Sequence, residues 1–279
     1  MFGEILEFWR RFTRNRAAVL GLTILFGALI LSMIAPILYP ESPFRVVGKP
    51  FLPPFGEYLL GTDSLGRDVA SGLAHGARTS LLVGFLATFM AVVVGTLIGG
   101  FAGYYGKWID DVLMRLTEFF QTIPYFIFAI VLVAILTPSI ESIIIAVAAV
   151  TWPPIARLVR GEFIAMRNRE FVQAYFIMGM NDLRIIFQQI LPNTLSPIIV
   201  TGSLMVATAI LIESALSFLG LGDPNIMSWG FMVGAGRTYL RSAWWLCTIP
   251  GVAILLTVLA INLVGEGLND VLNPRLRHL

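Results

Sequence analysis

Few side chains in this sequence have the types and spacing that catalysis or metal binding requires. Cys247 is the single cysteine, so neither an intrachain disulfide nor a cysteine-based metal site can form. The two histidines, His75 and His278, lie too far apart for an H-E-x-x-H zinc helix. Neither Lys49 nor Lys107 fits G-x-x-x-x-G-K-[ST], the P-loop pattern that holds nucleotide phosphates. The residues therefore predict a protein that is not an enzyme and holds no metal or cofactor of its own.

Glu213 is the one acidic residue well inside a long apolar segment. A carboxylate at membrane depth is costly, and it usually faces a cavity or a charged partner. Two interpretations follow. Glu213 lines a solute path or its gate near the outer side, or it is a capped or paired structural acid where the helix ends early, at Ser214.

A second polar group combines Asp63, Arg67 and Asp68 with the glycines Gly61 and Gly66. These charges either contact a partner protein or hold a network of turns. The turn network is favoured, because Asp beside a tight glycine turn often bonds to its own backbone.

The composition identifies the elements that must position these residues. Of the 279 residues, 57% are hydrophobic and 13% charged, and the mean hydropathy is +0.83. Soluble domains average about 45–50% apolar and about 25% charged residues. The composition excludes an ordinary soluble enzyme, a disordered chain and a nucleic-acid binder. It predicts an all-α polytopic membrane protein, because strand-like alternation of polar and apolar residues is absent.

Six segments poor in charge are predicted to cross the membrane as helices: 17–38, 79–105, 119–140, 142–159, 194–212 and 242–265. Six spans put both termini on one side, and most Lys and Arg residues lie in the segments on that side. The positive-inside rule therefore places both termini in the cytoplasm.

The predicted layout has four parts. Residues 1–16 form a cytoplasmic amphipathic helix at the membrane interface, with Ile5, Phe8, Trp9 and Phe12 on one stripe. The alternative is an unstructured basic start. Residues 17–38 are the first span, 39–78 an external loop, and 79–279 a core with five spans and a cytoplasmic loop at about 160–193.

The cytoplasmic loop has an apolar pattern that needs explanation. Its first half places one stripe on a helix: Phe171, Ala174, Tyr175 and Met178. Gly179 is suited to end that helix, and Asn181 to cap a second one that Pro192 ends. The second stripe consists of Leu183, Ile186, Phe187 and Ile190. Such a face outside the membrane must be buried, either on the bilayer and the protein's own helix ends or on a cytoplasmic partner.

The same loop resembles the EAA loop of ABC-importer permeases, whose pattern is E-A-A, three residues, G, nine residues, I-x-L-P. Ala174, Gly179 and the pair Leu191-Pro192 stand at matching positions, whereas Gln173, Tyr175 and Gln189 depart from the pattern. Residues 61–81, 215–222 and 262–275 resemble the second (C-type) permease subunit of the dipeptide/oligopeptide/nickel family, although Ser71-Gly72 replaces its usual Ser-Arg.

The resemblance implies a type I ABC-importer transmembrane fold in a bacterial inner membrane. It implies a second homologous permease, two ATPase subunits that bind ATP and Mg²⁺, an extracytoplasmic solute-binding protein, and surrounding lipid. The residues expected to contact the ATPases are Glu170, Phe171, Ala174, Tyr175, Met178, Gly179, Asp182, Leu183 and Arg184. Di- and oligopeptides are the expected solutes, and nickel chelates or peptide conjugates are the alternatives. A stand-alone secondary transporter is the remote alternative, but no internal repeat supports it.

Overall fold

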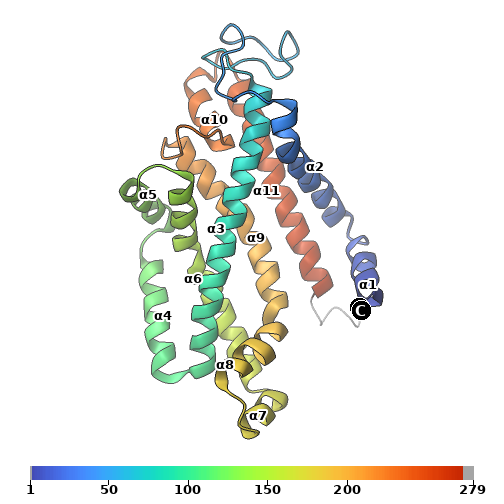
Figure 1. The fold of residues 1–279 in the computed structure, drawn as a ribbon, viewed down its shortest axis with the longest axis vertical. Helices are drawn as coiled ribbons and strands as arrows, with labels where there is room; N and C mark the ends of the chain where they lie inside the picture. The colour runs from blue at the N-terminus through green and yellow to red at the C-terminus, as the bar shows by residue number, and fades with distance from the viewer. Residues whose placement is uncertain (1, 273–279) are drawn as a thin grey trace.

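The computed structural model describes residues 2–272 and is built from helices (Figure 1). The side chain of Ile5, and His278 with the C-terminal arginines, lie outside the described part. In chain order the helices are α1 (Phe2–Phe12), α2 (Arg16–Leu38), α3 (Val69–Tyr105), α4 (Lys107–Thr122), α5 (Tyr125–Leu136), α6 (Ile140–Arg167), α7 (Glu170–Ile177), α8 (Asp182–Arg184), α9 (Leu191–Phe218), α10 (Trp229–Gly236) and α11 (Trp245–Leu272). The β structure within residues 2–272 is limited to two isolated bridges, so the predicted all-α class is confirmed.

Five stretches are long and apolar enough to span a membrane: α2, α3, α6, the continuous run Asp182–Phe218, and α11. The remaining predicted span, 119–140, corresponds to parts of two helices, α4 and α5. The chain bends by 87° between α4 and α5. The residue before a proline disfavours helical backbone, and Ile123, which precedes Pro124, is extended at φ −88° and ψ 130°.

The other predicted boundaries also shift. Asp68 caps α3 through the backbone N–H of Ala70, so this helix begins ten residues before the predicted span at 79. At 37 residues, α3 is about 55 Å long, well beyond the roughly 30 Å of a bilayer core. The expectation that Pro192 ends the second loop helix is wrong. A π-helical turn at Ile185–Ile190 carries α8 directly into α9, where Pro192 occupies the first turn.

Close packing of α3 on α6 forms the centre of the bundle. Three glycines at four-residue spacing, Gly95, Gly99 and Gly103, face the α6 backbone. A Cβ atom at Gly99 would lie 2.2 Å from the carbonyl oxygen of Ala156. Small residues at this spacing let two membrane helices approach closely, and Phe163 fills the space beside Gly103.

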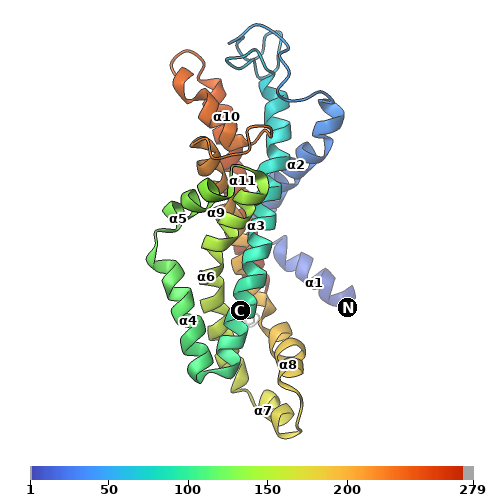
Figure 2. The same ribbon diagram turned by 60° about the vertical axis from the view of Figure 1, so that its left-hand side comes forward.

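The two ends of the molecule carry different elements. The loop between α2 and α3, residues 39–68 (the outer loop), lies at one end together with α10, and α7 lies at the other (Figures 1 and 2). Helix α1 and the C-terminal end of α11 lie toward the α7 end. Phe12 is buried against Val271 and Ala18, and Asn15 donates a 3.0 Å hydrogen bond to Asp270. Part of the stripe predicted to face lipid therefore packs on protein.

Candidate functional site

The EAA-like segment, residues 169–190 (the coupling segment), projects from the end of the bundle opposite the outer loop (Figure 2). Helix α7 ends at Gly179, whose φ is +73°. The N–H of Gly179 donates to the oxygen of Phe176, and that of Met180 to the oxygen of Tyr175, as in a Schellman cap. Asn181 then caps the second helix through the N–H of Leu183 at 2.9 Å. The helix end at Gly179 and the cap at Asn181 are therefore confirmed.

Helix α7 presents an uncovered apolar surface. Val172 is its buried residue, packed with Phe163 and Ile185 of the neighbouring core. Exposed large apolar side chains of the coupling segment are Phe171, Phe176, Ile177, Met178, Leu183 and Phe187, with Ile177 at 82% the most exposed. Ala174, Glu170 and Arg184 are exposed as well. Nothing within residues 2–272 covers this surface, so it is free to meet another protein.

Two predicted contact residues turn inward. Tyr175 packs partly into the core cluster around Val172. Asp182 accepts a 2.8 Å hydrogen bond from the hydroxyl of Tyr104, at the end of α3. The guanidinium of Arg167 lies 5.8 Å from the Tyr104 ring. Tyr104 thus ties the coupling segment to α3. The two residues are 78 positions apart in the sequence, so no local sequence pattern could predict this hydrogen bond.

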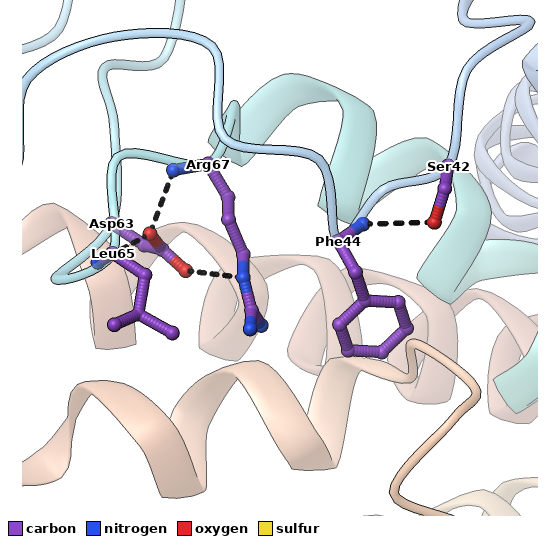
Figure 3. Close-up of polar contacts among 5 residues, drawn as sticks. All are labelled: Ser42, Phe44, Asp63, Leu65 and Arg67. Carbon is purple, nitrogen blue, oxygen red and sulfur yellow. Dashed lines mark hydrogen bonds and ion pairs between the residues drawn. The ribbon is translucent and has the colours of Figure 1, made fainter.

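The charged residues of the outer loop form a turn network (Figure 3). Asp63 accepts hydrogen bonds of 2.8 Å from the backbone N–H groups of Leu65 and Arg67. The Nε atom of Arg67 is 4.0 Å from Asp63, and its guanidinium lies 5.0 Å from the centre of the Phe44 ring. The carboxylate of Asp68 caps α3. Asp63 and Arg67 therefore contact each other within the loop and Asp68 bonds to the start of α3, which supports the favoured interpretation.

Two glycines permit these turns. Gly66 has φ +76°, and a Cβ atom there would lie 2.2 Å from the carbonyl oxygen of Gly48. Gly61 has φ +79°, and its Cβ would lie 2.4 Å from the oxygen of Leu52. Only glycine fits both the backbone conformation and the space.

Glu213 is 1% exposed and lies inside α9, which continues past it to Phe218. The alternative in which the helix ends at Ser214 is therefore wrong. Three serine hydroxyls donate to the carboxylate: Ser217 at 2.8 Å, Ser80 at 3.1 Å and Ser214 at 3.3 Å. Because Ser80 belongs to α3, these hydrogen bonds link α9 to α3, close to the start of α10. This geometry fits a structural acid better than a group that lines an open path.

Comparisons with known proteins place this geometry among transport proteins. Residues 95–278 match the family described as binding-protein-dependent transport system inner membrane component. Residues 5–54 match the N-terminal TM domain of oligopeptide transport permease C.

Relatives that match nearly the whole chain are also permeases of peptide transport systems. The chain is 41% identical over 273 residues to the dipeptide transport system permease protein DppC of Alkalihalophilus pseudofirmus, covering 97% of this chain and 90% of that protein. It is 38% identical over 272 residues to the oligopeptide transport system permease protein OppC of Haemophilus influenzae, covering 95% and 87%. A chain of the inward-facing MetNI methionine ABC transporter aligns with a TM-score of 0.58 at 17% identity, covering 72% of this chain and 96% of its own length. That likeness confirms the type I importer fold.

Proposed function

The chain belongs to the binding-protein-dependent transport system inner membrane components, and from this premise we propose that it is the C-type permease subunit of an ABC importer for di- and oligopeptides. The observation that carries the proposal is the identity of about 40% with dipeptide permeases over nearly the whole chain. Nickel chelates and peptide conjugates are the competing solutes, and a transport assay distinguishes them.

We assign the remaining tasks of the importer to partners. A second permease completes the solute path, an extracytoplasmic binding protein delivers the peptide, and two ATPase subunits bind ATP and Mg²⁺. This chain lacks a P-loop lysine, which agrees with that division of labour. We place the α7 end of this inner-membrane protein in the cytoplasm, with both termini, and the outer loop on the extracytoplasmic side, as the distribution of Lys and Arg favours.

The uncovered surface of α7 is the proposed ATPase contact. Phe171, Ala174, Met178 and Leu183 remain exposed there, and Ile177 adds a large apolar side chain that the loop pattern did not single out. An apolar patch flanked by charges is typical of a protein contact. Asp182 and Tyr175 act behind this surface, because they attach the coupling segment to the core.

The connections of α7 suggest how ATPase closure moves the bundle. Helix α6 leads into α7, and Asp182–Phe218 forms one continuous helical run behind it. Only short connections, residues 168–169 and 178–181, separate α7 from these helices, so a displacement of α7 acts on the ends of two membrane helices. The π-helical turn at Ile185–Ile190 is the expected hinge, since π turns inside α-helices often occur at functional sites. Alternating access is the transport mechanism that this arrangement favours.

Affinity purification from mild detergent tests the proposal. The tagged chain is expected to recover a second permease and ATPase subunits, and the reconstituted complex with its binding protein to import labelled dipeptides at the expense of ATP. Met178→Arg should lose the ATPases and keep the second permease, because Met178 is 69% exposed on α7. Leu59→Arg is the matched control, since Leu59 is 64% exposed on the outer loop. Recovery of this chain alone, without ATPase, would instead support a secondary transporter.

A further inference from the structure

A charged cleft is lined by residues of α4 and α6. The facing parts of these two helices lie in the half of the molecule that carries α7 (Figure 1). The empty volume of the cleft, including space that is open to solvent, is about 750 Å³. Acids and arginines line it in equal number, together with one methionine: Asp110, Asp111, Met114, Arg115, Glu118, Arg157 and Arg160. A cleft with both signs of charge suits a ligand that also carries both.

Different contacts flank the two ends of the cleft. At the end nearer α7, Arg160 donates two hydrogen bonds, of 2.5 and 2.6 Å, to the carboxylate of Asp110. At the other end, the Phe120 ring centre lies 5.3 Å from that of Trp152 and 5.7 Å from that of Phe128. The remaining charges thus lie between a fixed ion pair and an aromatic barrier.

Four of the charges are free to bind. Arg115, Arg157, Asp111 and Glu118 are exposed, and none of them forms an ion pair within residues 2–272. On helix α4, residues three and four apart are separated by about 4.5 and 6 Å along the axis. A dipeptide is at most about 7 Å long, so its ammonium and carboxylate groups reach oppositely charged positions of this stripe at the same time.

The adjoining side of α4 indicates which way the cleft faces. Large exposed apolar residues follow one another there at helical spacing: Trp108, Val112, Leu116 and Phe119. Such a stripe suits lipid or another apolar surface, whereas unpaired charges in a membrane protein face water or protein. The charged side of α4 and α6 therefore faces water or another protein, not lipid.

We propose that this cleft is a station on the inner half of the solute path, which holds a zwitterionic peptide by both of its ends. The ammonium group binds Glu118, and the carboxylate binds Arg115 and Arg157, for which guanidinium forks are well shaped. Each charged side chain that binds the peptide also has a side chain of opposite charge beside it, which competes with the peptide for that contact. Binding therefore stays weak enough for release, as a conduction path requires. This inference rests on the proposed peptide-import function.

Chemical protection of a cysteine tests the station. In a Cys247→Ala background, Met114→Cys puts a thiol in the cleft of the assembled, nucleotide-free importer, and its rate of maleimide modification is measured. Millimolar Ala-Ala is expected to slow modification several-fold, whereas N-acetyl-Ala-Ala and Ala-Ala-amide give little protection. Adding Glu118→Gln or Arg157→Gln should raise the half-protecting concentration roughly five- to tenfold, as loss of one charged contact implies. Val112→Cys, on the apolar face, is the matched control and should not respond.

Three outcomes would overturn the inference: no protection, equal protection by blocked and free dipeptides, or protection that survives both charge substitutions. Glycerophosphoethanolamine is a separate probe, because a phosphatidylethanolamine headgroup is also a zwitterion. Protection by this probe and not by Ala-Ala would assign the cleft to lipid. ATP-driven dipeptide uptake by the unsubstituted importer is measured in parallel. Intact uptake without protection refutes the station alone, whereas absent uptake refutes the proposed function.

Discussion

Tyr104→Phe removes the hydroxyl that ties the coupling segment to α3 and leaves the ring in place. The lost bond is 2.8 Å long and ends on the carboxylate of Asp182. Hydrogen bonds to charged groups contribute about 1.5–3 kcal/mol. Asp182 is partly exposed, so water replaces the hydroxyl, and the net loss falls to about 1 kcal/mol. The equilibrium between attached and detached coupling segment then shifts about fivefold toward the detached form.

We expect this detachment to lower the number of peptides imported per ATP hydrolysed. The assay measures labelled-dipeptide uptake and phosphate release in the same proteoliposomes, which contain the complete importer. Tyr104→Phe should reduce the ratio several-fold while ATP hydrolysis and complex recovery persist. Tyr105→Phe is the matched control, because Tyr105 is the neighbouring tyrosine and its hydroxyl makes no hydrogen bond within residues 2–272.

A double-mutant cycle makes the prediction refutable. Asp182→Ala should produce a similar defect, and the double variant should be no worse than the more severe single variant, because both remove the same bond. Strictly additive losses, or a Tyr105→Phe defect equal to that of Tyr104→Phe, would refute the role assigned to this bond.

Three further predictions concern single positions. Gly179→Ala places an alanine in the left-handed conformation at the α7 cap, which costs about 1–2 kcal/mol although no atom lies within 4 Å of the added Cβ. This variant should reduce ATPase coupling without lowering membrane insertion. Gly161→Ala, at a helical position with nothing within 4 Å, should be neutral in the same assay. Gly99→Ala should separate α3 from α6 and so lower the thermal unfolding temperature in detergent. Gly27→Ala is the control, because no atom lies within 4 Å of the added Cβ, and equal shifts in the two variants would contradict the packing argument. Glu213→Ala leaves serine hydroxyls without their acceptor and should destabilise the folded protein by about 2–4 kcal/mol in a chemical-unfolding titration. Glu213→Gln should retain most of the stability and the uptake rate. Loss of uptake in Glu213→Gln at normal stability would instead support a role of Glu213 as a gate.

The sequence predicted the membrane class and most spans because these depend on local quantities. A continuous apolar run must satisfy its own backbone, and in lipid it does so as a helix. Likewise Gly179 and Asn181 are local signals of helix ends, and both occur where the pattern placed them. The likeness to C-type permeases rested on motif spacing, and the relatives confirm it.

Two of the errors came from proline, whose local signal is ambiguous. Pro124 separates two helices where one span was predicted, whereas Pro153, Pro154 and Pro192 lie within helical runs. Whether a proline ends a helix depends on what surrounds the freed carbonyl and on whether the proline falls in a first turn, as Pro192 does in α9. Tertiary packing sets those conditions, so the sequence could not rank the prolines.

The sequence by itself determined that this chain is a bundle of membrane helices with an apolar loop at residues 169–190, because hydropathy and helix-end signals act over a few residues. Only the tertiary structure decided which polar groups meet. It placed Tyr104 on Asp182, Ser80 on Glu213 and Arg160 on Asp110, each from a different helix. Such pairs form where close packing brings distant segments together and an unsatisfied polar group would be costly. No spacing along the chain encodes that proximity.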